Sequence, residues 1–100
     1  MMVEDQLTAA IVLWTGRGVS AIPSRSSEAV IREYGDDIGR TLLTKIFEIE
    51  ELFFRSNAHA EVADLVAMGE RAAADFRSQH PEVGEEAVQA LAWCYTYDYR

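Results

Sequence analysis

The stretch DDIGRTLLTKIFEIEELFFR, residues 36–55, decides the fold class of this chain. Its apolar residues recur at steps of three and four, the period of an α-helix. One stripe of this kind consists of Ile38, Leu42, Ile46, Ile49 and Phe53. The spacing predicts a helix over about 37–55, with Asp36 as its N-cap.

A second apolar stripe lies on the same predicted helix, about 100–150° round the helical wheel from the first. It consists of Leu43, Phe47 and Phe54. The two stripes together cover more than half of the circumference, which is typical of a central helix that is contacted from several sides. Glu50 falls between the stripes. If it is buried, it needs a partner such as an arginine, or a raised pKa.

Helical patterns precede this stretch as well. We expect a first helix over about 3–14 that ends at Gly16, then a loop that runs to residue 27. A short helix carrying EAVIREY follows, capped by Ser24 or Ser26 and ended by Gly35.

Two further helices are expected after residue 55. The first begins near Ala58 and carries Gly69, Ala72 and Ala73 on the face that also holds Phe76. Small residues on one face let another helix come close, which is a reason for a helix to tolerate Gly69. The second begins in HPEVGEEAVQALAW, with Pro81 in its first turn.

The closing stretch WCYTYDYR, residues 93–100, has two interpretations. As a helix, it places Trp93 beside Tyr97 and Tyr95 beside Tyr99, on two sides about 200° apart. As a strand, it points all four aromatic side chains to one side. We favour the helix. In either form the tail carries more aromatic surface than one small bundle buries easily.

These patterns predict an all-α chain, a single domain over residues 1–100, folded as a small antiparallel bundle of four to five helices. The alternative is an α+β fold with a terminal strand at 93–100. The chain has no apolar run long enough for a signal core or a membrane span, and acids lie near its start. We therefore expect a cytoplasmic protein.

The charge is strongly acidic, with 17 acids against nine bases and a net charge of −8. Such a field repels phosphate, so direct binding of nucleic acid or of an anionic membrane is disfavoured. It attracts basic partners and also favours solubility.

No motif indicates a catalytic, cofactor or metal site. The G-x-G-x-x-A pattern that starts at Gly16 is followed by Pro23, where a dinucleotide-binding turn needs a running helix. His59 and His80 lie on separate segments and lack carboxylates at ligand spacing. The single cysteine, Cys94, falls on a predicted core face, where cysteine behaves as a small hydrophobe.

The sequence therefore suggests a non-enzymatic protein that acts by protein–protein contact, and more specifically an inhibitor of a basic partner. The alternatives are a homodimeric structural or regulatory protein, and a small enzyme with a carboxylate site near Glu50. The interface candidates are the acids and aromatics of the central helix and the tail: Phe47, Glu48, Glu50, Glu51, Phe54, Trp93, Tyr95, Tyr97 and Tyr99.

Overall fold

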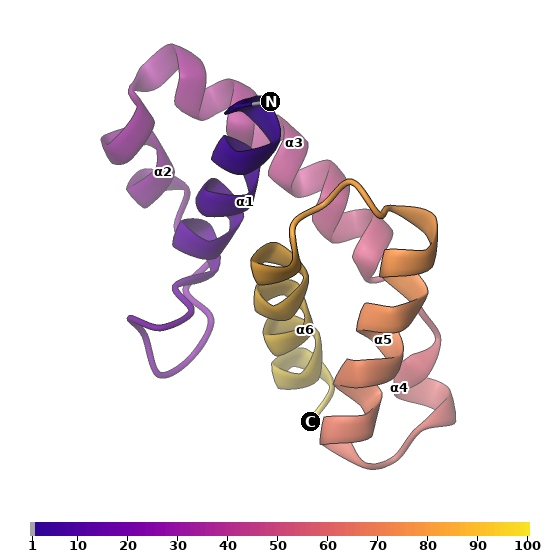
Figure 1. The fold of residues 1–100 in the computed structure, drawn as a ribbon. Coiled ribbons are helices and arrows are strands. Elements are labelled where there is room, and N and C mark those ends of the chain that lie inside the picture. Colours follow the sequence, from indigo (N-terminus) through magenta and orange to yellow (C-terminus); the bar gives the residue numbers. More distant parts are fainter. Residues whose placement is uncertain (1) are drawn as a thin grey trace.

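The computed structural model describes residues 2–100, with the side chains described from Gln6 onward. Six helices follow one another along the chain (Figure 1): α1 (Met2–Thr15), α2 (Ser27–Tyr34), α3 (Asp36–Phe53), α4 (Ala58–Glu61), α5 (Leu65–Gln79) and α6 (Glu85–Tyr99). Between residues 2 and 100 there is no strand, so the tail is helical and the α+β alternative is wrong. The predicted all-α bundle is confirmed.

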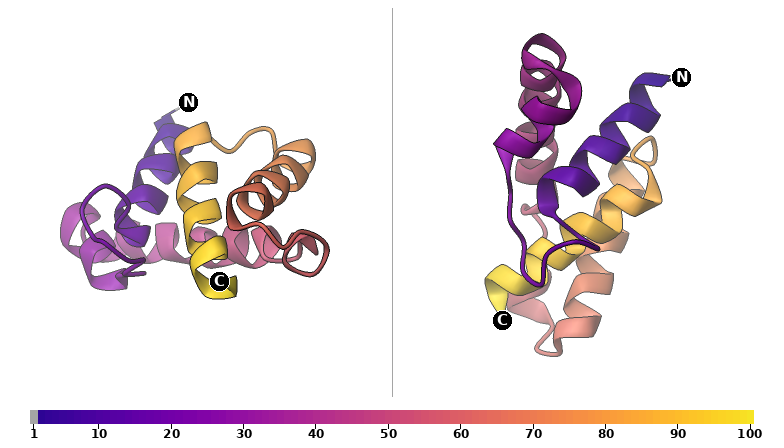
Figure 2. Two further views of the ribbon diagram at one scale, coloured as in Figure 1. Left: turned by 90° about the horizontal axis from the view of Figure 1, so that it is seen from below. Right: turned by 90° about the vertical axis from the view of Figure 1, so that its left-hand side faces the viewer.

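Helix α3 runs across the molecule and meets α1 and α2 near its start and α5 near its end (Figures 1 and 2). Its core stripe is buried at Leu42, Ile46 and Phe53, as predicted. Ile49 is partly buried, and Ile38 is exposed over 51% of its surface. The residue that faces α2 at this level is Gly39, where an added Cβ would lie 3.0 Å from the Cα of Ile31.

The bend between α2 and α3 depends on Gly35, which has φ 86°. Its backbone N–H donates to the Ile31 carbonyl and ends α2, and the same residue is the N-cap of α3. A side chain is disfavoured at this φ, which explains the glycine. The prediction that Asp36 caps α3 is therefore wrong, because α3 already includes Asp36. The predicted Ser26 cap of α2 is confirmed, since its side chain accepts from the Ala29 N–H.

The helix expected from Ala58 onward is interrupted after Glu61. Asp64 accepts the Ala67 N–H with its carboxylate at 2.9 Å and caps a new helix, α5. The last helix also begins later than expected, after the N-cap Gly84, so that Pro81 lies in the preceding turn. In both cases the helix begins later than the sequence predicts, at a cap residue that the helical period of the segment does not reveal.

Helices α5 and α6 run antiparallel and lie side by side, and α1 packs against α6 (Figures 1 and 2). The close approach expected at Gly69 is confirmed, because an added Cβ would meet the Thr96 Cγ2 at 2.9 Å. All six helices contribute to one core cluster, and the radius of gyration is 13.1 Å. None of the described helices is both long and apolar enough to cross a membrane.

Candidate protein-binding surface

The aromatic residues of α6 divide into an inner and an outer group. Tyr95 is fully buried, Trp93 and Tyr97 are half-buried, and Tyr99 is 39% exposed. Tyr95 packs on Phe54 with ring centroids 5.1 Å apart. Tyr95 is therefore a core residue, which corrects its place among the interface candidates. Tyr95 and Cys94 are the fully buried residues of the described tail, whereas Trp93, Thr96 and Tyr97 are partly buried.

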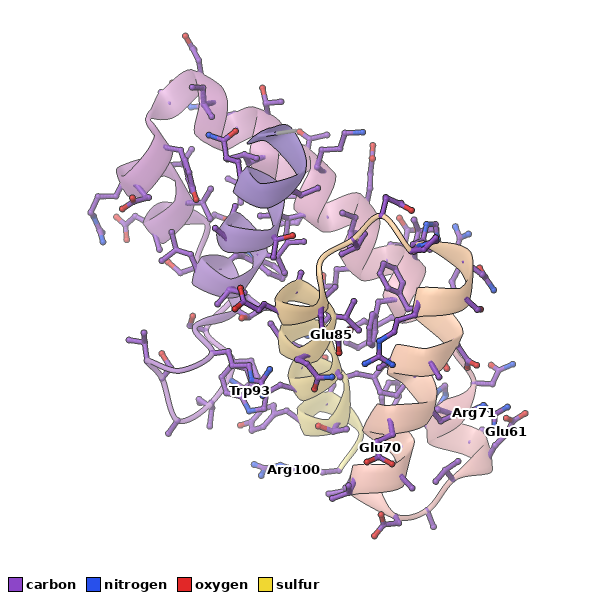
Figure 3. All side chains as sticks on the ribbon, in the orientation of Figure 1. Glu61, Glu70, Arg71, Glu85, Trp93 and Arg100 are labelled. Carbon is purple, nitrogen blue, oxygen red and sulfur yellow. The ribbon has the colours of Figure 1, made fainter. Side chains whose placement is uncertain are left out.

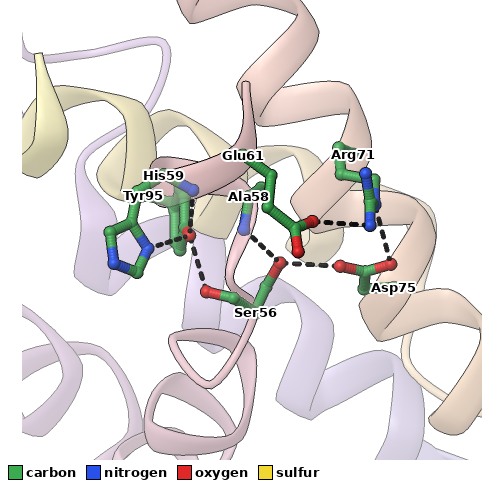
Figure 4. A network of polar contacts seen from close by, with 7 residues as sticks. All are labelled: Ser56, Ala58, His59, Glu61, Arg71, Asp75 and Tyr95. Atoms are coloured by element: carbon green, nitrogen blue, oxygen red, sulfur yellow. Dashed lines mark hydrogen bonds and ion pairs between the residues drawn. The ribbon is translucent and has the colours of Figure 1, made fainter. Parts of the chain in front are cut away.

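The Tyr95 hydroxyl ties α6 to the start of α4 (Figure 4). It donates to the Ser56 carbonyl oxygen at 2.8 Å and accepts the His59 backbone N–H at 3.0 Å. The His59 Nδ1 lies 2.8 Å away. Because the phenolic proton is used toward Ser56, Nδ1 carries a proton and donates. Burial is the largest cause of the raised pKa of Tyr95, and the hydrogen bond that it accepts from the His59 backbone N–H opposes that shift.

A second set of polar contacts joins the same turn to α5 (Figure 4). The Ser56 hydroxyl donates to Asp75 at 2.7 Å and accepts the Ala58 N–H at 3.2 Å. Arg71 bridges Asp75 and Glu61 across the break between α4 and α5. Side chains from three segments thus stabilise the break between α4 and α5. These polar groups are already paired within the fold.

Arg25, in the loop between α1 and α2, joins the loop to α3 and α6. Its Nε donates to Glu50 at 2.7 Å and its Nη2 to Asp98 at 2.8 Å. The guanidinium carbon also lies 5.8 Å from the centroid of the Phe54 ring. Partial burial disfavours the charged guanidinium, but the hydrogen bonds to Asp98 and Glu50 outweigh it and raise the pKa of Arg25. Glu50 thus has the arginine partner that its position between two apolar stripes demands.

Phe47 stands beside this arrangement on α3 with 49% of its surface exposed. Its ring contacts the buried Trp14 edge-on, with centroids 6.0 Å apart. A shallow depression is lined by these side chains, which we call the acidic-aromatic face: Arg25, Phe47, Glu50, Glu51, Phe54 and Asp98. Tyr99 adjoins it through Phe54, with ring centroids 6.2 Å apart.

The structure brings together four of the predicted interface residues on this face, namely Phe47, Glu50, Glu51 and Phe54, with Tyr99 at its border. Glu48 does not line it. That carboxylate lies 4.0 Å from Lys45, and both residues line a different depression. Trp93 and Tyr97 line a third depression near the loop between α1 and α2.

Two residues of the face, Arg25 and Asp98, are absent from the candidates that the sequence suggests. Their side chains meet although they lie 73 positions apart in the chain. The apolar surroundings of Glu50 predict a cationic partner but do not say which arginine supplies it. Asp98 has no sequence signal of its own, because its role depends on where the loop crosses α6.

The reactive groups of the chain are few. Burial raises the pKa of the Cys94 thiol to about 11, so the thiolate that could act as a nucleophile is disfavoured at neutral pH. No group of three His, Cys, Asp or Glu side chains that could hold a metal occurs in the described part of the chain. What the face offers is fixed negative charge beside exposed aromatic surface. Comparison with protein-family models, curated proteins and solved structures finds no match for this chain.

Proposed function

We propose that this protein is a non-enzymatic binding protein that docks a basic protein partner on its acidic-aromatic face. The observation that carries the proposal is the half-exposed Phe47 ring, which lies in one depression with the carboxylates of Glu50, Glu51 and Asp98. An exposed aromatic ring beside an excess of negative over positive charge, here three carboxylates against Arg25, is the arrangement of a hot spot with a steering rim.

Each part of the face has a separate role in the proposed contact. Burial of the exposed half of the Phe47 ring would contribute about 1 kcal/mol to the free energy of binding. Glu51 is exposed and free to meet a cation on the partner. Glu50 and Asp98 are held by Arg25, so they are already ordered before the partner arrives and lose little side-chain entropy on binding.

The charge of the whole chain supports the same partner class. A net charge of −8 speeds the approach of a basic protein and slows that of an acidic one. The sharper form of the proposal is an inhibitor that covers the basic site of a protein that processes nucleic acid. In that form the carboxylates of the face take the place of phosphate groups.

A homodimer through the same face is the second candidate, favoured by the exposure of Phe47. A two-fold axis would set the carboxylates of one copy against those of the other, which costs electrostatic free energy. Sedimentation at several protein concentrations distinguishes the two candidates. A dimer that Phe47→Ser abolishes would support the homodimer, whereas a monomer at all concentrations leaves the face free for a different protein.

An enzyme with an acid at Glu50 is the third candidate. The Arg25 pair supplies a structural reason for this carboxylate, so catalysis is not needed to explain it. Activity that disappears in Glu50→Gln, while the fold is retained, would favour the enzyme over the binding protein.

The direct test is capture of partners from the native cell extract by the immobilised chain, compared between charge-matched variants. Glu51→Lys reverses a charge on the face, and Glu33→Lys makes the same change on an exposed residue of α2. We expect a basic protein to be recovered by the wild type and by Glu33→Lys, but not by Glu51→Lys or Phe47→Ser. Equal recovery by all four, or no specific recovery from low through moderate salt, would refute the proposal.

A further inference from the structure

A second surface lies between α5 and α6, away from the acidic-aromatic face. Leu65, Val66 and Gly69 on α5, together with Trp93 and Thr96 on α6, line a depression that we call the α5–α6 groove. A neighbouring depression shares Leu65, Trp93 and Thr96 and extends to Ile22 of the loop. The two are therefore continuous along α6, on the side where Trp93, Glu70 and Arg100 are labelled in Figure 3.

Several large apolar side chains that line the groove are exposed to solvent. Val66 is 71% exposed, Leu65 and Ile22 are also exposed, and Trp93 is only half-buried. Val66 and Leu65 occupy the first turn of α5, where polar residues would serve a solvent-facing helix equally well. Clusters of large apolar side chains of this kind mark contact sites for other molecules.

The charges around the groove differ from those of the rest of the molecule. Six of the nine Lys and Arg residues pair with a carboxylate of this chain. Among the side chains that the structure describes, Arg17, Arg55 and Arg100 have no such partner. Of these three, Arg17 lines the groove and Arg100 lines the neighbouring depression that continues it along α6. A chain with 17 acids thus leaves cations free at its apolar groove.

Arg100 is also held in position. Its guanidinium carbon lies 4.2 Å from the centroid of the Tyr97 ring, a cation–π contact that orders the side chain without neutralising it. Arg77, which lines the groove as well, donates its Nε to Glu85 at 2.8 Å and is therefore already paired. Glu70 lines the groove too and has no cationic partner among the described side chains, so the unpaired charges there are two cations, Arg17 and Arg100, and one carboxylate.

We propose that the α5–α6 groove binds an apolar peptide segment of a partner protein, whose carboxylates pair with Arg17 and Arg100. The apolar side chains of the segment cover Leu65, Val66 and Trp93. This surface is separate from the acidic-aromatic face, so the protein offers one face to a basic partner and another to an acidic segment. Nucleic acid fits poorly here, because its many phosphates would meet the net negative field with only two free guanidinium groups to offset it.

The overall charge does not prevent this contact at physiological salt. At about 0.15 M ionic strength, charges separated by more than about 8 Å are largely screened. The distant acids of the chain then repel the segment weakly, whereas direct contact with Arg17 and Arg100 persists. Lower salt is expected to weaken binding of the acidic segment, since it strengthens the long-range repulsion more than the contact.

The test uses two synthetic amphipathic helical peptides that share a leucine face and carry either glutamate or lysine at the remaining positions. Each is titrated into the ¹⁵N-labelled protein at 0.15 M salt, and the amide shifts of Leu65, Val66, Gly69 and Thr96 are followed. We expect the glutamate peptide to shift these amides and the lysine peptide to leave them largely unchanged.

Matched variants give the second arm of the test. Arg17→Gln with Arg100→Gln is expected to weaken binding of the glutamate peptide about threefold or more. Arg55→Gln removes the third unpaired arginine, away from the groove, and should leave the affinity unchanged. Equal shifts of the groove amides by the two peptides, glutamate-peptide shifts that map outside the groove, no binding of the glutamate peptide, or equal effects of the two arginine changes would each overturn the proposal.

Discussion

At the scale of the residue, Arg25 is the clearest case of a position whose role depends on tertiary structure. It lies in a loop with φ 47°, a conformation that non-glycine residues rarely adopt. Its contacts with Glu50 and Asp98 offset the local strain, because one guanidinium pairs with two carboxylates from different helices. The loop is thereby attached to the acidic-aromatic face.

We expect Arg25→Ala to lower the free energy of unfolding by about 1–2 kcal/mol, because it leaves the half-buried Glu50 without its partner. The control is Arg32→Ala, which removes an exposed pair with Glu28 and should change the free energy by less than about 0.5 kcal/mol. Urea denaturation of both variants measures the difference. Equal effects would show that the Arg25 contacts do not stabilise the fold.

Glu85 offers a residue-scale prediction about pH. Hydrogen bonds from Arg77 and Gln89 lower its pKa from 4.5 to about 2. Because the folded-state pKa is lowered, any stability that this pair contributes is complete above pH 4.5 and is lost as the pH falls toward 2. Glu85 is exposed, so the effect on the free energy of unfolding is small.

An NMR titration of the Glu85 side-chain carboxyl should therefore show a midpoint well below its ordinary value, and Arg77→Gln should move that midpoint upward. A wild-type midpoint near 4.5 would contradict the assigned contacts.

At the scale of the element, the sequence predicts helices well and helix ends less well. The period of three and four in residues 36–55 is sufficient to predict α3, because burial of one face is what that period reflects. The break at Val62–Asp64 is not visible in the period, since both α4 and α5 continue the same alternation. It depends on Asp64, which caps α5 with a single hydrogen bond.

The packing of α5 on α6 makes a prediction at Gly69. Alanine favours a helix by roughly 1 kcal/mol over glycine, but its Cβ would lie 2.9 Å from the Thr96 Cγ2. The Thr96 hydroxyl donates to the Trp93 carbonyl, which holds that methyl group in place. We expect Gly69→Ala to lower the melting temperature in the wild type.

Thr96→Ser removes the obstructing methyl group and keeps the hydroxyl. In that background we expect Gly69→Ala to be neutral or to raise the melting temperature. Thermal unfolding of the four proteins in this double-mutant cycle tests the contact. The same change in both backgrounds would show that Thr96 is not what requires the glycine.

At the scale of the whole molecule, the candidate site is less predictable from sequence than the fold. Phe47, Glu50 and Glu51 lie on α3 and Phe54 is its C-cap, so their grouping follows from the helical period. Glu48 shares that helix yet faces another depression, and Tyr95 is buried although Trp93 and Tyr97 on either side of it are partly exposed. Which side of each helix remains uncovered depends on how α1, α6 and the loop pack, and a pattern within one segment does not contain that information.

The two proposed binding surfaces, the acidic-aromatic face and the groove with unpaired arginines, are expected to prefer partners of opposite charge. Their separation predicts that changes on one leave binding at the other intact. Net charge alone would predict a preference for basic partners everywhere on the surface.

The measurement that tests the central claim most directly is the binding kinetics of the captured basic partner, followed by surface plasmon resonance over a series of salt concentrations. We expect Glu51→Lys to slow association and to flatten its salt dependence, and Phe47→Ala to speed dissociation at least severalfold, while Glu33→Lys stays close to the wild type. Kinetics that are indifferent to both Glu51→Lys and Phe47→Ala would contradict the claim that this protein binds through its acidic-aromatic face.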